Sequence, residues 1–385
     1  MSAVHLTAAG TAPTWKSWFV LFSLLTDPRY LSYRLRRRWA RLVGGTPPSP
    51  SPRPRATAAA DDLGALEVDL VCPWVSGQDP KHREKRDYWL QQCGLPPRLF
   101  NPDVRYVEED ELRYALRSVE KFAPWVRKVF IVTDDQVPPW LDRSNPRVEI
   151  VDHRQIIDAR FLPTFNTKVI INSLQNIPGL SEHFIYTNDD CFFGQPCRKE
   201  DFFTTKRGGG IAMKIMFPQR EKNFDSWIVP AHLVNHDPLA RLWMSSYNSL
   251  KVLLELRRPW QKIRYVDSHQ TQPMIKSELQ SAVREFPREH QETAARRFRS
   301  VHDISFISIA RYRALARGTA VLGFVPHTFF PYERDLRSYT CETLPTLFCI
   351  NAGLGEESLR EDRILARLFR EPSAFELAPA KESIV

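Results

Sequence analysis

The sequence predicts an α/β fold, with a doubly wound, nucleotide-binding type of sheet in the first half of the folded chain and a helix-rich second half. Strand-like and helix-like segments alternate between residues 68 and 190, as expected for a sheet with helices on both faces. Residues 235–320 instead show mostly helical spacing of apolar residues. Acidic residues follow several of the strand-like runs, which is where ligands bind in such sheets.

The individual elements follow from short apolar runs and from helical spacing. Residues 73–80 form a turn-rich loop after the first run, and residues 109–122 are amphipathic because Leu112, Leu116 and Val119 recur on one face. Leu279, Val283 and Phe286 form a similar stripe, which we interpret as core. The expected strands are 68–72, 129–133, 148–151 and 184–187, and the expected helices of this half are 109–122 and 167–177.

The charge is concentrated at one end of the chain. The 385 residues carry a net charge of +9, and the first 60 hold nine Lys or Arg and one acid, Asp27, which accounts for +8 of it. The rest is close to neutral, so a broad basic surface for nucleic acid is not expected there. With 43% hydrophobic residues, the chain can bury a sizeable core.

The first 44 residues combine an apolar run, Trp18–Leu25, with the basic run Arg34–Arg41. The apolar run is far shorter than the ~20 residues of a membrane span, and the order of the two runs is wrong for a signal peptide. Two interpretations remain, peripheral contact with an anionic membrane and a poorly ordered basic tail. Residues 45–64 are a Pro-rich linker, residues 65–355 form the folded domain, and residues 356–385 are a C-terminal tail.

The most informative stretch is Asn188-Asp189-Asp190, directly after the apolar run 184–187. Two adjacent carboxylates at a strand end repel each other unless a cation lies beside them. Mg²⁺ or Mn²⁺ carrying a phosphate suits such a pair, because these ions prefer carboxylate and phosphate oxygens. The alternative is a polar turn. Asp79 and Asp134 also follow strands, and Asp69 lies inside one, so it needs an Arg partner or faces the site.

The six cysteines are scattered and form no Cys-x-x-Cys pair, so the sequence does not predict a zinc site. Several lie in apolar runs, where we expect small buried side chains.

Four ordered motifs resemble those of the Stealth proteins, a family of bacterial capsule and exopolysaccharide phosphotransferases that also includes the animal lysosomal-enzyme N-acetylglucosamine-1-phosphotransferase. The segments that carry the resemblance are Val68–Pro80; Glu111–Trp125 with Ile131–Gln136, Leu162–Phe165 and Tyr186–Asp190; His269 to Asp303; and Leu347–Asn351. They span most of the folded chain, so residues 65–355 are expected to be a Stealth-type catalytic domain.

The resemblance implies a Rossmann-like, glycosyltransferase-type core and a defined reaction. A sugar-1-phosphate, of a hexose or an N-acetylhexosamine, moves from a UDP-sugar to a sugar hydroxyl of a polysaccharide or glycan acceptor. The product is a phosphodiester and UMP is released. The expected location is the bacterial cytoplasm, with peripheral contact at the inner face of the membrane.

The resemblance also assigns residues. Asp189 and Asp190 are catalytic and the expected metal ligands, His269 is a general base or acid, and Arg299 makes forked contacts to phosphate oxygens. The expected substrate or phosphate ligands are Asp69, Trp74, Asp79, Arg113, Arg117, Asn188 and Asn351. Without the resemblance, structural roles are favoured for His269 and Arg299. The same alternative stays open for Trp74, and a structural role is slightly favoured for Arg113 and Arg117.

The sequence departs from the family pattern at four places. Ala352 follows Asn351 where relatives usually carry Asn-Asp, Ile171 stands where many have Glu, and Pro73 replaces a Thr. The segment around His269 also lacks the Pro and second His of the animal form. Two alternatives therefore remain, an ordinary metal-dependent glycosyltransferase and a non-catalytic polysaccharide-binding relative.

Overall fold

The computed structural model describes residues 63–95, 106, 110–206, 209–216, 270–300, 302–323, 325–330, 336–350 and 364–378. The N-terminal segment 1–44 and nearly all of the linker 45–64 lie outside these residues, so contact with an anionic membrane stays a prediction. Within the described residues, no helix is both long enough and apolar enough to cross a membrane.

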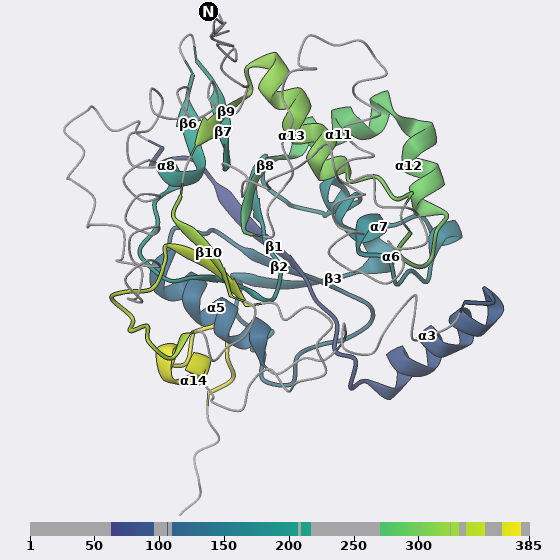
Figure 1. Cartoon of the computed structure of the whole chain (residues 1–385), viewed down its shortest axis with the longest axis horizontal. Coiled ribbons are helices and arrows are strands. Elements are labelled where there is room, and N and C mark those ends of the chain that lie inside the picture. Colours follow the sequence, from purple (N-terminus) through teal and green to yellow (C-terminus); the bar gives the residue numbers. More distant parts are fainter. Residues whose placement is uncertain are drawn as a thin grey trace, which may run out of the picture. The chain divides into compact units, whose positions relative to one another are not determined.

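The central sheet has five strands in the order β3-β2-β1-β4-β8 (Figure 1). The first four are parallel, and β8 pairs antiparallel with β4. The strands are β1 (Val68–Pro73), β2 (Val129–Thr133), β3 (Val148–Asp152), β4 (His183–Tyr186) and β8 (Gln272–Ile275). The four strands expected from the sequence are all confirmed, with ends that differ by at most one residue.

Alternate residues of the parallel strands enter two different cores. Leu70 of β1 and Ile131 of β2 pack with α5 (Glu111–Phe122). Val71 and Phe130 pack instead with α7 (Thr167–Ile171), α11 (Lys276–Glu285) and α13 (Phe306–Arg317). The period of two is that of a strand buried on both faces. Figure 1 shows α5 on one side of the sheet and α7, α11 and α13 across it, so the doubly wound fold is confirmed.

The expected helix 167–177 is divided into α7 and a 3₁₀ turn, η3 (Leu174–Asn176). Asn172 lies between them, and its amide donates to the Ile304 carbonyl at 2.9 Å and accepts from the Phe306 N–H at 2.8 Å. The side chain therefore fixes the start of α13. The sequence spacing could not reveal this long-range contact.

Two small sheets flank the central one, and short helices complete the fold. One has the order β10-β11-β5, with β10 (His327–Phe330), β11 (Leu347–Ile350) and β5 (Cys191–Phe193). The other has the order β6-β7-β9, with β6 (Phe203–Thr205), β7 (Ile211–Met216) and β9 (Ala320–Gly323). The remaining elements are α3 (Pro80–Gln92), α6 (His153–Ile156), η2 (Ala159–Phe161), α8 (Lys199–Phe202), α12 (Pro287–Ala294) and α14 (Ile364–Leu368).

The expected C-terminal tail, 356–385, contains part of the folded unit. Residues 364–378 include α14 and Phe375, whose side chain has no exposed surface. Glu376 is also buried and pairs with two arginines of α5. The folded unit therefore includes residues 364–378, which lie after the expected boundary at residue 355.

Candidate functional site

The acidic turn lies at the topological switch point of the central sheet. From β1 the chain builds β2 and β3 on one side, and then adds β4 on the other side of β1. Ligands of doubly wound sheets bind beyond the carboxyl ends of the strands at such a point. Asn188, Asp189 and Asp190 directly follow β4, so the fold places them there.

A tight turn presents the two carboxylates. The Cys191 N–H donates to the Asn188 carbonyl at 3.2 Å, which leaves Asp189 and Asp190 as the central residues of the turn. All three residues from Asn188 to Asp190 are half-buried. The chain passes through this turn from β4 of the central sheet to β5 of a flanking sheet.

Three segments hold the turn. The Tyr186 hydroxyl donates to the Asn188 side-chain oxygen at 2.7 Å. The Thr187 and Thr271 hydroxyls are 2.9 Å apart, and the Ile350 N–H donates to the Asp190 carbonyl at 3.0 Å. The ends of β4, β8 and β11 therefore meet here.

Two expected site residues, His269 and Asn351, lie outside the described residues, so their assignments stay predictions. Their described neighbours nevertheless reach the turn. Thr271, two residues after His269, contacts Thr187, and Ile350, directly before Asn351, contacts Asp190.

Arg299 lies in a loop that is fixed against the segment before α7. The Phe165 N–H donates to the Arg297 carbonyl at 2.7 Å, and the Arg299 guanidinium donates to the Thr167 hydroxyl. Burial raises the pKa of Tyr186, and the positive charge of Arg299 acts in the opposite direction, so the guanidinium interacts electrostatically with the end of β4. Arg299 and the acidic turn are therefore at the same end of the sheet.

Asp303 anchors this loop, a role that its position in the sequence did not predict. Its carboxylate is buried and accepts from the Asn166 amide at 2.9 Å and from the Ser300 N–H at 2.7 Å. Burial raises the pKa of Asp303 above its usual value, although these hydrogen bonds act in the opposite direction. The only sequence signal was its place at the end of the third motif.

The two acids of the turn act on the buried groups beside them. Burial raises the pKa of Tyr186 far above its usual value, and Cys191, Cys72 and Asp190 raise it further. Burial also raises the pKa of the Cys72 thiol, followed by the charge of Asp189. The Tyr186 hydroxyl therefore stays protonated and donates to Asn188.

The donor atoms of the turn fit Mg²⁺ or Mn²⁺. Asp189, Asp190 and Asn188 offer carboxylate and amide oxygens, which these hard cations prefer. Ligands of doubly wound sheets bind at this end, so phosphate oxygens would be further ligands of such an ion. The two carboxylates would hold the ion, and its charge would offset that of a pyrophosphate.

Asp69 does not lie at this end of the sheet. It is the second residue of β1, and its carboxylate accepts from the Arg127 guanidinium at 2.8 and 2.6 Å and from the Ser181 N–H at 2.7 Å. The side chain has no exposed surface. The structural alternative, an Arg partner for a buried Asp, describes Asp69, and its expected contact with substrate is not supported.

Arg113 and Arg117 are likewise bound to a structural partner. Glu376 accepts from the Arg113 Nε at 2.6 Å and from the Arg117 Nε and Nη2 at 2.6 and 2.7 Å. Burial alone would raise the pKa of Glu376, but the hydrogen bonds from Arg117, the Ser373 backbone and Arg113 lower it to about 2. The two arginines join α5 to the C-terminal segment, which is the structural role that the sequence slightly favoured for them.

Trp74 and Asp79 follow β1, at the same end of the sheet as the acidic turn. Trp74 is 5% exposed and packs in the core with α5, so the core alternative describes it. Asp79 accepts from the Lys81 N–H at 2.9 Å and from the Gln136 amide at 3.1 Å, and it caps α3. Asp134, after β2, forms an ion pair with Lys85 at 2.7 Å.

Two of the departures from the family pattern have a plain structural setting. Ile171 ends α7 and is buried in the core between the sheet and α11. Pro73 ends β1, where its missing N–H costs no interior ladder bond. Ala352 lies outside the described residues.

Comparisons with known proteins agree with this geometry. The family model described as Stealth protein CR2, conserved region 2, matches residues 105–210, and that of conserved region 3 matches residues 268–312. A capsular polysaccharide phosphotransferase of Haemophilus influenzae is 32% identical over 296 residues, which cover 74% of this chain and 78% of that protein.

Longer relatives are similar over part of their length. Exopolysaccharide phosphotransferases of Streptomyces coelicolor and Mycobacterium tuberculosis are 35% and 36% identical, over 83% of this chain in each case. The chain spans 54% and 59% of these two proteins. Among solved structures, the WbbM bifunctional glycosyltransferase covers 76% of this chain and 46% of its own, with a TM-score of 0.30 and 6% identity, too low to carry a conclusion.

The identity to the Haemophilus protein extends over most of both chains, and the two conserved regions include the acidic turn and Arg299. The chain therefore belongs to the Stealth family, whose matched relatives are capsular and exopolysaccharide phosphotransferases.

Proposed function

We propose that this chain is a phosphotransferase of bacterial capsule or exopolysaccharide synthesis, which moves a sugar-1-phosphate from a UDP-sugar to a sugar hydroxyl and releases UMP. The names of its relatives support the phosphotransfer and the polysaccharide. The UDP-sugar and the release of UMP rest on the family resemblance and on the chemistry of the site.

One observation carries the proposal. Two half-buried carboxylates occupy the centre of a tight turn at the switch point of a doubly wound sheet, with a guanidinium at the same end. Phosphoryl transfer asks a protein mainly to position the reactants and to offset charge. A cation on the carboxylates and a guanidinium nearby supply positive charge on two sides of a pyrophosphate.

The reaction balances without another reactant. The acceptor hydroxyl oxygen attacks the phosphorus that carries the sugar, and the bond from that phosphorus to the bridging oxygen breaks. The hydroxyl proton passes to a base and UMP leaves with the bridging oxygen. The sugar keeps its bond to oxygen, so its anomeric configuration is retained.

The residues divide these tasks. Asp189 and Asp190 bind the cation, or one of them accepts the hydroxyl proton. Arg299 is held by Thr167 and directs its remaining N–H groups to phosphate oxygens. His269 is the side chain of the four that titrates near neutral pH, so we propose it as the general base or acid.

The test is the identity of the released nucleotide. The purified chain is incubated with Mg²⁺, a panel of UDP-sugars and oligosaccharide acceptors, and the products are followed by ³¹P NMR and by separation of UMP from UDP. We expect UMP and a phosphodiester resonance, both lost in Asp190→Asn and kept in Asp158→Asn, a matched change of an exposed carboxylate.

The other outcomes contradict the proposal in different ways. Release of UDP without a phosphodiester would indicate ordinary glycosyl transfer. Binding of polysaccharide without turnover of any UDP-sugar would indicate a non-catalytic relative. Normal turnover in EDTA would show that the reaction needs no divalent cation, without contradicting the transfer of sugar-1-phosphate.

A further inference from the structure

Two cysteines far apart in the sequence face each other beside the acidic turn. Cys191 of β5 and Cys349 of β11 are directly opposite in an antiparallel pair. The neighbouring residues carry the ladder hydrogen bond, from the Ile350 N–H to the Asp190 carbonyl, so the cysteines form a non-hydrogen-bonded pair. In such pairs the side chains leave the same face and lie closest together.

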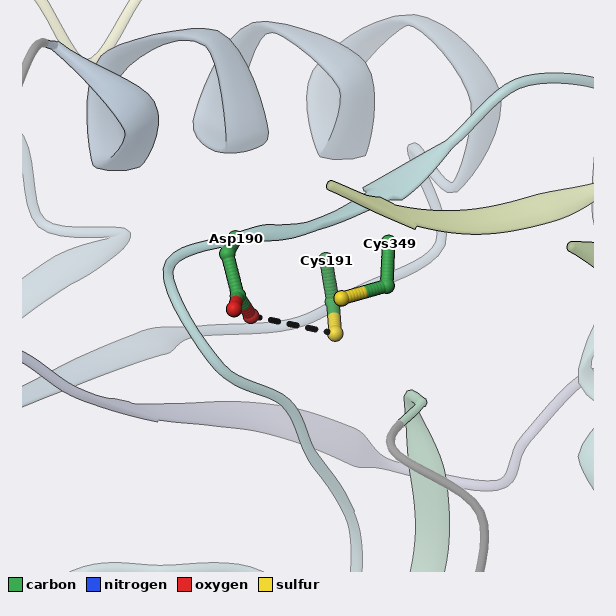
Figure 2. Close-up of side chains that lie close together, drawn as sticks. All are labelled: Asp190, Cys191 and Cys349. Atoms are coloured by element: carbon green, nitrogen blue, oxygen red, sulfur yellow. Dashed lines mark hydrogen bonds between the residues drawn. The ribbon is translucent and has the colours of Figure 1, made fainter. Parts of the chain in front are cut away.

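Asp190 supplies a third donor atom to this pair. The Cys191 thiol donates to the Asp190 Oδ1 at 3.5 Å, and one oxygen of Asp190 and both sulfurs all lie within 4.8 Å of one another. Figure 2 shows the carboxylate pointing at the two sulfurs, which lie side by side. Both cysteines are buried, whereas Asp190 is half-buried and opens the group toward the strand-end site.

We propose that Asp190, Cys191 and Cys349 form a binding site for a thiophilic divalent cation, Zn²⁺ or Cd²⁺. Two thiolates and one carboxylate match the ligand types that zinc takes. In a tetrahedral zinc site the sulfurs are about 3.8 Å apart, as Zn–S bonds of about 2.3 Å require. The donor atoms lie within 4.8 Å of one another, and binding would bring the sulfurs together by side-chain rotation.

The fold prepares these donors. Cys191 and Cys349 lie on paired strands and Asp190 lies in a hydrogen-bonded turn, so little backbone order remains to be created on binding. The three side chains supply three ligands and leave a fourth position for water, as in open zinc sites. Binding replaces the thiol protons, so affinity rises with pH.

This site shares Asp190 with the proposed Mg²⁺ site but differs from it in chemistry. Mg²⁺ does not favour thiolates, and zinc does. A thiophilic cation would therefore withdraw the Asp190 carboxylate from the hard cation and inhibit the enzyme. This consequence for activity rests on the proposed function, whereas the binding site does not.

The experiment measures binding without substrate. The full chain, freshly reduced and freed of reductant without air, is titrated with CdCl₂, and the ultraviolet charge-transfer band between thiolate and cadmium is recorded. We expect saturation at one tightly bound Cd²⁺, and at least a tenfold weaker affinity in Cys191→Ser and Cys349→Ser. Cys93→Ser, a change of an exposed cysteine, is the matched control and should keep the site.

A second measurement requires no variant, in case the serine variants do not fold. The ¹¹³Cd chemical shift of the wild-type complex reports the number of sulfur ligands, and we expect two. A shift that indicates one sulfur or none would overturn the site. Equal affinities of wild type and a folded Cys349→Ser would overturn it as well. Lack of sugar-phosphate transfer by the same preparation would refute the proposed function and leave this result unchanged.

Discussion

The two ends of the central sheet hold aspartates in opposite ways. At the amino end, the Asp69 carboxylate is fully buried and accepts from a bidentate guanidinium and a backbone N–H. At the carboxyl end, Asp189 and Asp190 are half-buried in a turn that the backbone defines. In the sequence, both groups of aspartates stand out because they lie within or directly after an apolar strand. What separates them is burial and place: Asp69 is fully buried against Arg127, whereas Asp189 and Asp190 lie half-buried at the centre of a turn, at the end of the sheet where ligands bind.

The amino end gives the largest expected effect on stability. Asp69→Asn removes one charge of a buried pair, which typically costs 3–5 kcal/mol. Arg127 is 37% exposed and regains water, so we expect a loss near the lower limit, about 3 kcal/mol, in urea unfolding. The turnover of the protein that remains folded should be unchanged.

The control for this change is Asp158→Asn, whose exposed pair with Arg160 should contribute little. If Asp69→Asn unfolds at the wild-type urea midpoint, the pair of Asp69 and Arg127 does not contribute to stability. A loss of turnover at full folding would instead return Asp69 to the site.

The carboxyl end should respond in the opposite way. Asp190→Asn keeps the backbone carbonyl that accepts from Ile350, so the turn should remain and stability should change little. The lost charge should lower kcat at least ~10²-fold, a range typical of lost charge-stabilising or proton-transfer groups. The rate at saturating donor checks the expected loss of kcat, and the melting temperature checks the expected unchanged stability. A folded Asp190→Asn variant with wild-type activity would contradict the catalytic role of the Asp189 and Asp190 pair.

The local elements could be predicted from the sequence because their signals are local. The run Val129–Thr133 is apolar throughout and forms a strand with those bounds. Leu112, Leu116 and Val119 recur at helical spacing and form the buried face of α5. The acidic turn could be found for the same reason, since it is a strand end followed by turn-forming acids.

The partners of charged and polar residues could not be predicted, because they come from distant parts of the chain. Nothing near Asp69 in the sequence identifies Arg127, and nothing near Arg117 identifies Glu376. The same limit explains the cysteines. The sequence has no Cys-x-x-Cys motif and therefore predicted no zinc site, but strand pairing brings Cys191 opposite Cys349.

The carboxyl end also contains a buried imidazole that should make stability depend on pH. His153 follows β3, is 2% exposed, and its two ring nitrogens have no hydrogen-bond partner among the described residues. Burial lowers the pKa of His153 to about 4, whereas its usual value is 6.5. The unfolded chain therefore binds the proton first, and the contribution of this group to stability is lost as pH falls from 6.5 toward 4.

The expected size of this loss is about 2 kcal/mol between pH 7.5 and pH 5. His153→Phe keeps an aromatic ring without a titrating group, so urea unfolding at the two pH values should show a smaller change for the variant than for wild type. Other groups titrate equally in both proteins. The difference between wild type and variant in the pH dependence of the unfolding free energy therefore reports His153 alone. An equal change of unfolding free energy between pH 7.5 and pH 5 in wild type and variant would contradict the lowered pKa of His153.

The smallest effect should separate two neighbouring arginines of one loop. Arg297 donates to the Pro163 carbonyl at 2.6 Å, and its guanidinium lies 3.9 Å from the centre of the Trp89 ring, so its contacts are structural. Arg299 donates to Thr167 near the end of β4. Lysine lacks the planar fork, so Arg299→Lys cannot easily bind Thr167 and phosphate together and should lower kcat/KM about tenfold. Arg297→Lys should instead lower the melting temperature and keep kcat/KM. If both variants lose only stability, Arg299 belongs with Asp69 among the structural residues, and the carboxyl end is reduced to its two carboxylates.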